Sequence, residues 1–375
     1  MRDCVVVHYG EIGTKGKNRG FFENKLMDSI KKITDTGIDK QYGRLVLEGN
    51  PKNLADLSSV LGIVSFSPAL RSELDIEKIK DKALLLAKEN PADTFAIETK
   101  RSNKNFSLDS KQISRIVGEH VARNTGMKVD LNDPGKKIFI EVSDKECYIY
   151  DKKIPGPGGL PVGVSGTVVS LLSGGIDSPV ASYLMMKRGC NVVFVHFHNY
   201  TSKIEEKIEK LVAVLNKYQY KSRLYMVPFF PIQEKIIEKI PETHRMIVYR
   251  RVMMRIAGKI AEKEGAKALV TGDNLAQVAS QTLDNLDVIH SASNETIFSP
   301  LIGMDKNDII DIAKKIATYD LSILPYPDCC TYMIAKHPET RAKKEEIESM
   351  EKELDIDNLA DYGIEKAEVK EIISS

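Results

Sequence analysis

The chain lacks any apolar run near the roughly 20 residues that a helix needs to cross a bilayer. Its first apolar run, residues 5–7, is too short for the core of a secretory signal peptide. Five cysteines in 375 residues, an odd number with two adjacent, argue against a disulfide framework and favour a reducing compartment. Together these absences predict a cytoplasmic protein with no membrane partner.

A strong charge of either sign is also missing, because the formal net charge is +1. The balance is uneven along the chain: residues 1–338 carry +7 and residues 339–375 carry −6. A mildly basic body is compatible with nucleic-acid binding but does not require it. The last segment is predicted to be an acidic C-terminal tail.

A Walker-type phosphate loop, G-x-x-x-x-G-K-[ST], is absent as well. The one near match, at Gly16-Lys17, has Glu11 in place of the first glycine and Asn18 in place of the serine or threonine. Any nucleotide site in this chain must therefore depend on another pattern.

That other pattern is Ser173-Gly174-Gly175-Ile176-Asp177-Ser178, which follows an apolar strand and precedes a helical segment. Adjacent glycines let the backbone approach a ligand closely, and two hydroxyls with the first helical N–H groups can bind an anion. Asp177 would repel a bare phosphate, so we expect it to hold Mg²⁺ beside one. A capped Gly-Gly turn is the plainer alternative, but the strand–loop–helix context favours a nucleotide site.

From residue 167 onward strands and helices alternate, which predicts an α/β fold with a doubly wound parallel sheet. The expected strands are 167–172, 191–197, 222–227 and 267–271, and the expected helices are 178–188, 204–217, 232–240, 246–264 and 306–318. Ligands of such sheets bind at the carboxyl ends of the strands. We therefore expect the site near Leu172, His196 and Thr271.

The first 166 residues predict α+β structure in two domains, at 1–60 and 61–157, with a glycine- and proline-rich linker at 158–166. The remaining domain is then 167–375. In the N-terminal part the expected strands are 4–9, 44–48, 94–100, 137–142 and 146–150, and the expected helices are 20–33, 76–89 and 108–125.

Two basic loops of the N-terminal part suit contacts with an RNA backbone. The first, between residues 10 and 20, combines four glycines with Lys15, Lys17 and Arg19. The second follows an expected strand and presents Lys100, Arg101 and Lys104 close to Phe106, which suits phosphate contact with base stacking. Ordinary solvated surface is the alternative for both loops.

Ordered motifs are spread over nearly the whole chain. They lie at residues 8–12, 14–19, 155–163, 171–181, 185–189, 195–198, 249–255, 269–272, 277–282, 300–306, 324–326 and 328–330. The phosphate loop alone resembles that of many PP-loop ATP pyrophosphatases, which cleave ATP between the α- and β-phosphates. The full set resembles one family, the tRNA 4-thiouridine synthetases, ThiI.

The resemblance implies an N-terminal ferredoxin-like domain, a THUMP domain that binds the acceptor end of tRNA, and a PP-loop domain. It implies an enzyme that adenylates uridine 8 of tRNA with ATP and Mg²⁺ and then replaces the activated oxygen by sulfur, giving 4-thiouridine. A homodimer is also implied, with a cysteine desulfurase or free sulfide as sulfur donor. No cysteine follows Cys330, so we expect the form without a rhodanese domain. Sulfur delivery for the thiamine thiazole, a further role of the family, is the weaker expectation.

By the same resemblance, the ATP-binding residues are Leu171, Leu172, Ser173, Gly174, Gly175, Asp177, Ser178, His196, Phe197, Arg250, Gly272 and Gln281. The catalytic residues are Asp177, Lys306, Cys329 and Cys330, with Asp177 also the Mg²⁺ ligand beside the phosphates. Lys306 would stabilise charge that develops at the α-phosphate. Cys329 would carry sulfur or resolve an intermediate, because its spacing from Lys306 matches the family's catalytic cysteine, and Cys330 is its rival.

Three other functions compete with this one. A PP-loop ligase or amidotransferase acting on a small molecule needs neither a basic N-terminal half nor a cysteine pair. A noncatalytic tRNA-binding protein needs no intact phosphate loop, Lys306 or Cys329. An iron–sulfur cluster as sulfur carrier usually takes three or more cysteines, whereas this region offers an adjacent pair without C-x-x-C. The sequence therefore favours the tRNA sulfurtransferase.

Overall fold

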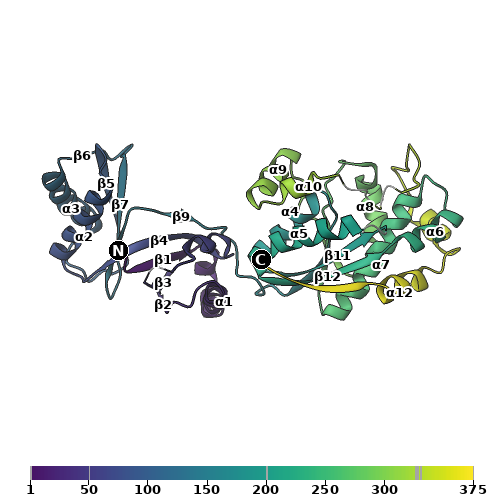
Figure 1. Ribbon diagram of the computed structural model, residues 1–375, viewed down its shortest axis with the longest axis horizontal. Helices are drawn as coiled ribbons and strands as arrows, with labels where there is room; N and C mark the ends of the chain where they lie inside the picture. The colour runs from purple at the N-terminus through teal and green to yellow at the C-terminus, as the bar shows by residue number, and fades with distance from the viewer. Residues whose placement is uncertain (1, 50, 200–201, 326–328, 330–331, 375) are drawn as a thin grey trace. The chain divides into compact units, whose positions relative to one another are not determined.

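The computed structural model describes residues 2–49, 51–199, 202–325, 329 and 332–374 (Figure 1). Its contacts divide the chain into two compact units, Met1–Pro161 and Val162–Ser375. The division falls inside the glycine- and proline-rich stretch expected to be a linker. Each unit is built on its own β-sheet and has its own core.

The N-terminal unit is α+β. Its described residues form one sheet in the order β2-β3-β1-β4-β8-β7-β5-β6, with β9 paired to β4. The strands are β1 (Cys4–Tyr9), β2 (Ile38–Gln41), β3 (Arg44–Glu48), β4 (Ile63–Ser72), β5 (Thr94–Arg101), β6 (Lys128–Val129), β7 (Lys136–Val142), β8 (Cys147–Tyr150) and β9 (Ile154–Pro155). The helices are α1 (Arg19–Lys31), α2 (Ile76–Glu89) and α3 (Ser110–Thr125), with short 3₁₀ helices at Glu11–Thr14, Gly16–Asn18 and Leu54–Ser59.

A long strand, β4, joins the two parts of this unit. Its residues Ile63 to Ala69 pair antiparallel with β1, and Leu70 to Ser72 pair antiparallel with β8. The parts expected at 1–60 and 61–157 therefore share one strand. The expected strands do not include it; Pro68 lies within the run, and a proline, which cannot donate a sheet hydrogen bond, weakens a strand prediction.

Helices α2 and α3 lie together beside the β5 and β7 part of the sheet (Figure 1). Asp75 caps α2 by accepting from the N–H groups of Glu77 and Lys78, and Asp109 with Gln112 forms a capping box at the start of α3. Apolar residues at helical spacing then pack on the strands as one core: Ile79, Ala83, Leu86, Ile113, Val117 and Val121 with Phe95, Ile138 and Ile140.

A buried carboxylate ties the two parts of the N-terminal unit together. Glu141 on β7 lies 2.9 Å from Nε2 of His8 on β1, 2.6 Å from Nη1 of Arg44 on β3, and accepts from the Tyr150 hydroxyl at 2.5 Å. Burial would raise the pKa of Glu141, but the hydrogen bond and charge of His8, the charge of Arg44 and the Tyr150 bond lower it to about 2. The ionised form therefore cross-links strands from both parts.

The C-terminal unit is a doubly wound α/β domain. Its described strands have the order β14-β13-β10-β11-β12-β15, parallel except for β15. They are β10 (Thr167–Leu171), β11 (Asn191–His198), β12 (Lys221–Pro228), β13 (Ala268–Val270), β14 (Thr296–Phe298) and β15 (Glu368–Ile373). The helices are α4 (Asp177–Lys187), α5 (Ser202–Gln219), α6 (Phe230–Lys239), α7 (Arg245–Glu264), α8 (Leu283–His290), α9 (Lys306–Lys315), α10 (Tyr319–Ser322), α11 (Lys344–Glu351) and α12 (Ile356–Glu365), with a 3₁₀ helix at Ala279–Gln281. The predicted parallel sheet is confirmed, with one antiparallel edge strand added.

Alternate residues of these strands supply two cores. Val193, Val195 and Phe197 of β11 pack in a cluster with α6, α7 and α12. The alternating residues Val192 and Phe194 of the same strand are also buried, and α4 and α5 contact this strand. Because helices cover both faces of the sheet, the carboxyl ends of the strands are the place left for a ligand.

The acidic segment 339–375 folds as part of this unit, as α11, α12 and β15. Helix α12 packs on α7, and β15 pairs with β12 from Lys221↔Ile373 to Met226↔Glu368. Glu351, at the end of α11, accepts hydrogen bonds from Arg251 and Arg255 of α7 at 2.7–2.9 Å. Part of the negative charge is therefore neutralised by α7. Throughout the described residues, every helix is too short or too polar to cross a membrane.

Candidate active site

The loop between β10 and α4 is closed by its own serine side chains. The Oγ of Ser178 accepts a hydrogen bond from the N–H of Ser173 at 2.8 Å, and the two Oγ atoms lie 3.0 Å apart. The Ser173 Oγ in turn accepts from the N–H of Gly175 at 3.3 Å. Helix α4 starts directly after the loop, and the first N–H groups of a helix have no partner within it. The arrangement can bind an anion such as a phosphate.

Asp177, the first residue of α4, brings two further side chains to this loop. Its Oδ1 lies 2.5 Å from Nζ of Lys306, the first residue of α9, and its Oδ2 accepts from Nε2 of Gln277 at 2.9 Å. Asp305 caps α9 and fixes the place where Lys306 leaves the helix. The sequence-predicted pair Asp177 and Lys306, 129 residues apart, is thus in direct contact.

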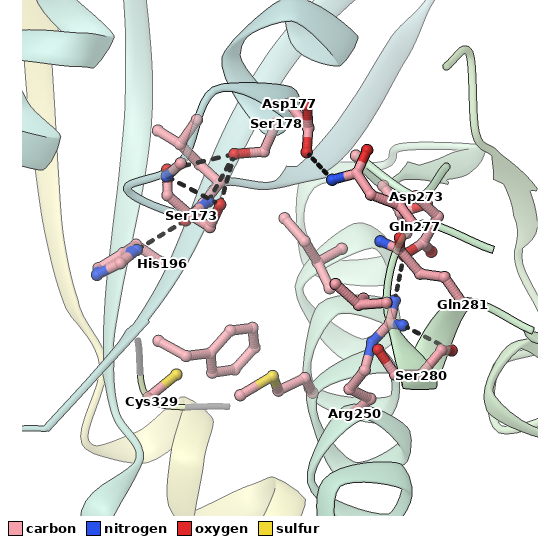
Figure 2. A pocket seen from close by; sticks show the side chains of 18 residues that line it. Ser173, Asp177, Ser178, His196, Arg250, Asp273, Gln277, Ser280, Gln281 and Cys329 are labelled. Carbon is pink, nitrogen blue, oxygen red and sulfur yellow. Dashed lines mark hydrogen bonds and ion pairs between the residues drawn. The ribbon is translucent and has the colours of Figure 1, made fainter. Parts of the chain in front are cut away.

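A pocket of about 320 Å³ opens at the carboxyl ends of β10, β11 and β13. Its walls contain Leu171, Leu172, Ser173, Gly175, Asp177, Ser178, His196, Phe197, Arg250, Met253, Thr271, Gly272, Asp273, Gln277, Val278, Ser280, Gln281 and Cys329. Figure 2 shows the loop serines with His196 in one group and Arg250, Asp273 and Gln281 in another. Of the residues predicted to bind ATP, only Gly174 does not line the pocket, although it belongs to the loop.

Gly272 allows the end of β13 to approach the phosphate-type loop. A Cβ atom added at Gly272 would lie 2.8 Å from the backbone N of Ser178 and 3.0 Å from its Cα. Both contacts are with backbone, which cannot move aside without displacing the start of α4. Glycine is therefore required here because two backbones meet, not because of a left-handed φ.

His196 ties the end of β11 to the same loop. Its Nδ1 lies 2.7 Å from the Leu172 carbonyl oxygen, so Nδ1 bears the proton and donates it. Burial lowers the pKa of His196 to about 4, although the Leu172 hydrogen bond opposes the shift. At neutral pH this histidine is uncharged and lies in the pocket wall, where its Nδ1–H is hydrogen-bonded to the Leu172 carbonyl.

Arg250 is held by a buried carboxylate that follows β13. Its Nη2 lies 2.6 Å from Oδ1 of Asp273, and its Nη1 donates to the Ser280 carbonyl at 3.3 Å. The same Oδ1 accepts from Nε2 of Gln281 at 3.2 Å, and Nε2 of His290 is 3.4 Å from Oδ2. Burial would raise the pKa of Asp273, but the charge of Arg250 and hydrogen bonds from His290, Thr271 and Arg250 hold it well below its usual range.

The neighbouring arginines of α7 have a different role. Arg251 is 1% exposed and donates Nε and Nη2 to Glu351, and Arg255 donates both Nη atoms to the same carboxylate. Arg250 belongs to the pocket, whereas Arg251 and Arg255 connect α7 to α11.

Cys329 lies in the pocket wall and is 6% exposed. Its carbonyl oxygen accepts from Nε2 of Gln233 at 2.7 Å and from the N–H of Tyr332 at 3.3 Å. Cys330, the rival prediction, lies outside the described residues. Burial raises the pKa of Cys4 to about 11 and of Cys147 to about 12 and also raises that of Cys190. These three thiols are buried and lie outside the pocket wall.

The six cations predicted to bind RNA differ in their contacts: the two arginines are hydrogen-bonded within their own loops, and three of the four lysines are exposed. Arg19 donates Nε to Glu23 at 2.7 Å and Nη2 to the Tyr9 hydroxyl at 2.6 Å, and Arg101 donates Nη1 to the carbonyls of Phe106 and Leu108. Both arginines therefore stabilise their own loops. Of the lysines, Lys15 is half-buried over the Phe22 ring, and the other three are exposed: Lys17, Lys100 and Lys104.

The sequence predictions omitted several residues of this region. Asp273 and Gln277 anchor predicted residues, and Gln233 reaches Cys329 from α6. A signal existed for Asp273, because it stands at the end of an expected strand where ligands bind. Gln277 belongs to the motif at 277–282, but its contact with Asp177, 100 residues away, left no local signal. Within the described part of the chain, no group of three or more His, Cys, Asp or Glu residues could hold a metal ion.

The fold and the pocket define the class: an α/β unit of the PP-loop type, with an anion-binding strand–loop–helix, joined to an α+β unit. Comparison with models of known families shows to which family within that class the chain belongs. The thiamine biosynthesis protein (ThiI) model matches residues 163–356, the THUMP domain model 73–151 and the ThiI ferredoxin-like domain model 4–67. The chain belongs to the ThiI family, as the motifs in its sequence predicted.

Curated relatives match over nearly the full chain. It is 44% identical to a probable tRNA sulfurtransferase of Caldanaerobacter subterraneus subsp. tengcongensis over 97% of this chain and 100% of the relative. It is 43% identical to a probable tRNA sulfurtransferase of Acetivibrio thermocellus over 98% of each. Among solved structures, a 4-thiouridine synthetase–RNA complex with bound ATP aligns with a TM-score of 0.90 and 34% identity, over 99% of this chain and 100% of that one.

Proposed function

We propose that this chain is an ATP-dependent tRNA sulfurtransferase that adenylates uridine 8 of tRNA and replaces the activated oxygen by sulfur to give 4-thiouridine. One observation supports this above the others. The pocket wall contains the anion-binding loop, Asp177 and Cys329, and Lys306, which is outside the wall, contacts Asp177. Adenylyl transfer and sulfur transfer need these two kinds of chemistry in one place.

In the first step, O4 of the uracil attacks the α-phosphorus of ATP and pyrophosphate leaves. The loop N–H groups and the hydroxyls of Ser173 and Ser178 bind phosphate oxygens, and Lys306 offsets the negative charge that grows at the α-phosphate. Asp177 is a hard oxygen donor at this place and would hold Mg²⁺ together with phosphate oxygens. When bound, Mg²⁺ neutralises phosphate charge.

In the second step, sulfur replaces the adenylated oxygen and AMP leaves. Cys329 would either carry the sulfur as a persulfide or resolve an intermediate by disulfide exchange, and its place in the pocket wall supports it over a cysteine elsewhere. A cysteine desulfurase would supply sulfane sulfur to the Cys329 thiolate as a persulfide, and an external thiol would reduce the disulfide that remains after transfer to the adenylated carbon. Free sulfide would instead attack that carbon directly and displace AMP, with no persulfide on Cys329. We propose that the protein acts as a homodimer in the cytoplasm and that its THUMP and ferredoxin-like parts bind the acceptor end of tRNA.

The proposal is tested by mass spectrometry of tRNA nucleosides from a strain that lacks the gene. We expect 4-thiouridine alone to disappear and to return with the wild-type gene. Complementation with Cys329→Ser should fail although the purified variant still releases pyrophosphate with tRNA, whereas Cys190→Ser, a buried cysteine outside the pocket, should complement. Unchanged 4-thiouridine in the deletion strain would favour a ligase that acts on a small molecule or a noncatalytic tRNA-binding protein.

A further inference from the structure

Gln233 occupies a position in α6 where an apolar residue is expected. The buried residues Phe229, Ile232, Ile236 and Ile240 recur at helical spacing and belong to the main core of the C-terminal unit. Gln233 lies on the same stripe and is 0% exposed. A polar amide in an apolar core costs free energy unless its groups are hydrogen-bonded, so its presence calls for a reason.

The amide of Gln233 makes one strong contact and leaves another unmade. Its Nε2 donates to the Cys329 carbonyl at 2.7 Å. Its Oε1 is buried and accepts no hydrogen bond within the described part of the chain. Half of the amide is therefore unsatisfied, which is a poor arrangement for stability alone. The contact that is made points to the backbone of Cys329.

Side chains of α6 and α7 together contact the described backbone at Cys329, Tyr332 and Met333. The Tyr249 hydroxyl donates to the Tyr332 carbonyl at 3.3 Å, and Nη1 of Arg245 donates to the Met333 carbonyl at 2.8 Å. The N–H of Tyr332 donates to the Cys329 carbonyl. Gln233 adds a bond at the cysteine itself, which lines the pocket.

We propose that Gln233 is a positioning residue that holds the Cys329 backbone so that its thiol faces the nucleotide pocket. The inference rests on the proposed function for the part of Cys329 in sulfur transfer. It assigns Gln233 no contact with ATP or tRNA. A thiol must reach the activated carbon within bonding distance, and a displacement of about 1 Å can lower a rate on the order of 100-fold.

Gln233→Leu tests this with the full-length protein, because leucine fills a similar volume without the amide. Removing a half-satisfied buried amide should leave the melting temperature unchanged or raise it. We expect 4-thiouridine formed per pyrophosphate released to fall on the order of tenfold or more. Alkylation of Cys329 by iodoacetamide, resolved from Cys330 by tandem mass spectrometry, should accelerate several-fold because the Cys329 backbone is no longer held against the core.

Asn216→Leu is the matched control. Asn216 is also 0% exposed and donates Nδ2 to a backbone carbonyl, that of Ile372 at 2.7 Å, but it accepts from the Ser222 hydroxyl as well. It should lower the melting temperature and leave the alkylation rate and the thiolation ratio unchanged. Wild-type alkylation and thiolation in Gln233→Leu would overturn the proposal, as would a loss of stability with both half-reactions reduced together. Alkylation is read without substrates, so it decides the role of Gln233 even if Cys329→Ser still thiolates tRNA.

Discussion

The two units hold their predicted functional cations in different ways. In the C-terminal unit, Lys306 and Arg250 are each fixed by a carboxylate, Asp177 and Asp273, at 2.5 and 2.6 Å. Among the six cations of the N-terminal unit predicted to bind RNA, Arg19 and Arg101 hold their own loops, while Lys17, Lys100 and Lys104 are exposed. A site that performs chemistry needs charges in fixed places, whereas a surface that attracts RNA can work with movable ones. Single substitutions should therefore have large effects in the first region and small ones in the second.

The largest effect is expected for Lys306→Ala. It removes the cation beside the phosphate-type loop and leaves Asp177 without its ion pair. We expect tRNA-dependent pyrophosphate release to fall on the order of 10²- to 10³-fold with an unchanged melting temperature. Lys315→Ala, an exposed lysine at the end of the same helix, is the control and should retain full activity. Near-normal release by Lys306→Ala would show that this cation does not act on the phosphates.

The next largest effect is expected for Glu351→Gln. This variant tests whether Arg251 has a structural role, unlike Arg250 of the pocket on the same helix. Arg251 would stay buried and lose its close carboxylate partner, with only Glu348 left at 3.9 Å, so the free energy of unfolding should fall by about 3 kcal/mol. Urea unfolding measures this change. Glu348→Gln, whose exposed carboxylate lies 3.9 Å from Arg251, should cost less than about 0.5 kcal/mol. Equal losses in both variants would mean that Arg251 does not depend on Glu351.

A smaller effect follows from the pKa of Glu141, lowered from 4.5 to about 2 in the folded state. Because the folded pKa is the lower one, this carboxylate stabilises the fold above pH 4.5, and the contribution is lost as the pH falls towards 2. About 2 kcal/mol should be lost by pH 3. Unfolding free energies of the wild type between pH 3 and 6 should show this slope, and Glu141→Gln should flatten it. Parallel curves for the two proteins would contradict the assignment to Glu141.

The smallest effects are expected for Lys17→Ala and Lys104→Ala. Each should weaken tRNA binding roughly threefold and lower the slope of log affinity against log salt by about one, because each removes one phosphate contact. Filter binding at several salt concentrations measures both quantities. Glu89→Gln is the control. Glu89 is exposed and forms an ion pair with Arg2 outside the two basic loops, so this variant should leave the salt slope unchanged. A loss above 100-fold from either lysine would place it in a fixed site and weaken the contrast between the units.

Much of the fold could be predicted from the sequence because its signals are local. The apolar run before the Ser-Gly-Gly segment predicted β10 and the phosphate-type loop, and the helices expected at 76–89 and 108–125 are α2 and α3. Other elements were missed where local signals conflict with tertiary structure. Strand β4 contains Pro68, and α11, α12 and β15 lie in a segment whose acidic composition predicted a tail.

The pocket was predicted residue by residue where family motifs mark it, but its connections were not. Nothing local distinguishes Arg250 from Arg251, and only the fold places Asp273 beside the first and Glu351 beside the second. Gln233 shows the same limit, because a glutamine on an apolar stripe is visible in the sequence while its partner, 96 residues away, is not. Sequence patterns name the elements, and tertiary contacts decide which side chains work as pairs.

The C-terminal strand β15 takes the edge position of the sheet and places charged residues there, Glu368, Lys370 and Glu371, beside the more apolar strand β12. It pairs with β12 over residues 221–226, and in its absence the backbone groups of that stretch would form an open edge. An open edge can add a strand from a second copy and grow into an aggregate. We expect a chain that lacks residues 368–374 to keep every pocket residue and to aggregate faster in light-scattering measurements, because the more apolar strand β12 would then form the edge. Strand β15 thus affects the solubility of the C-terminal unit, although it does not line the pocket.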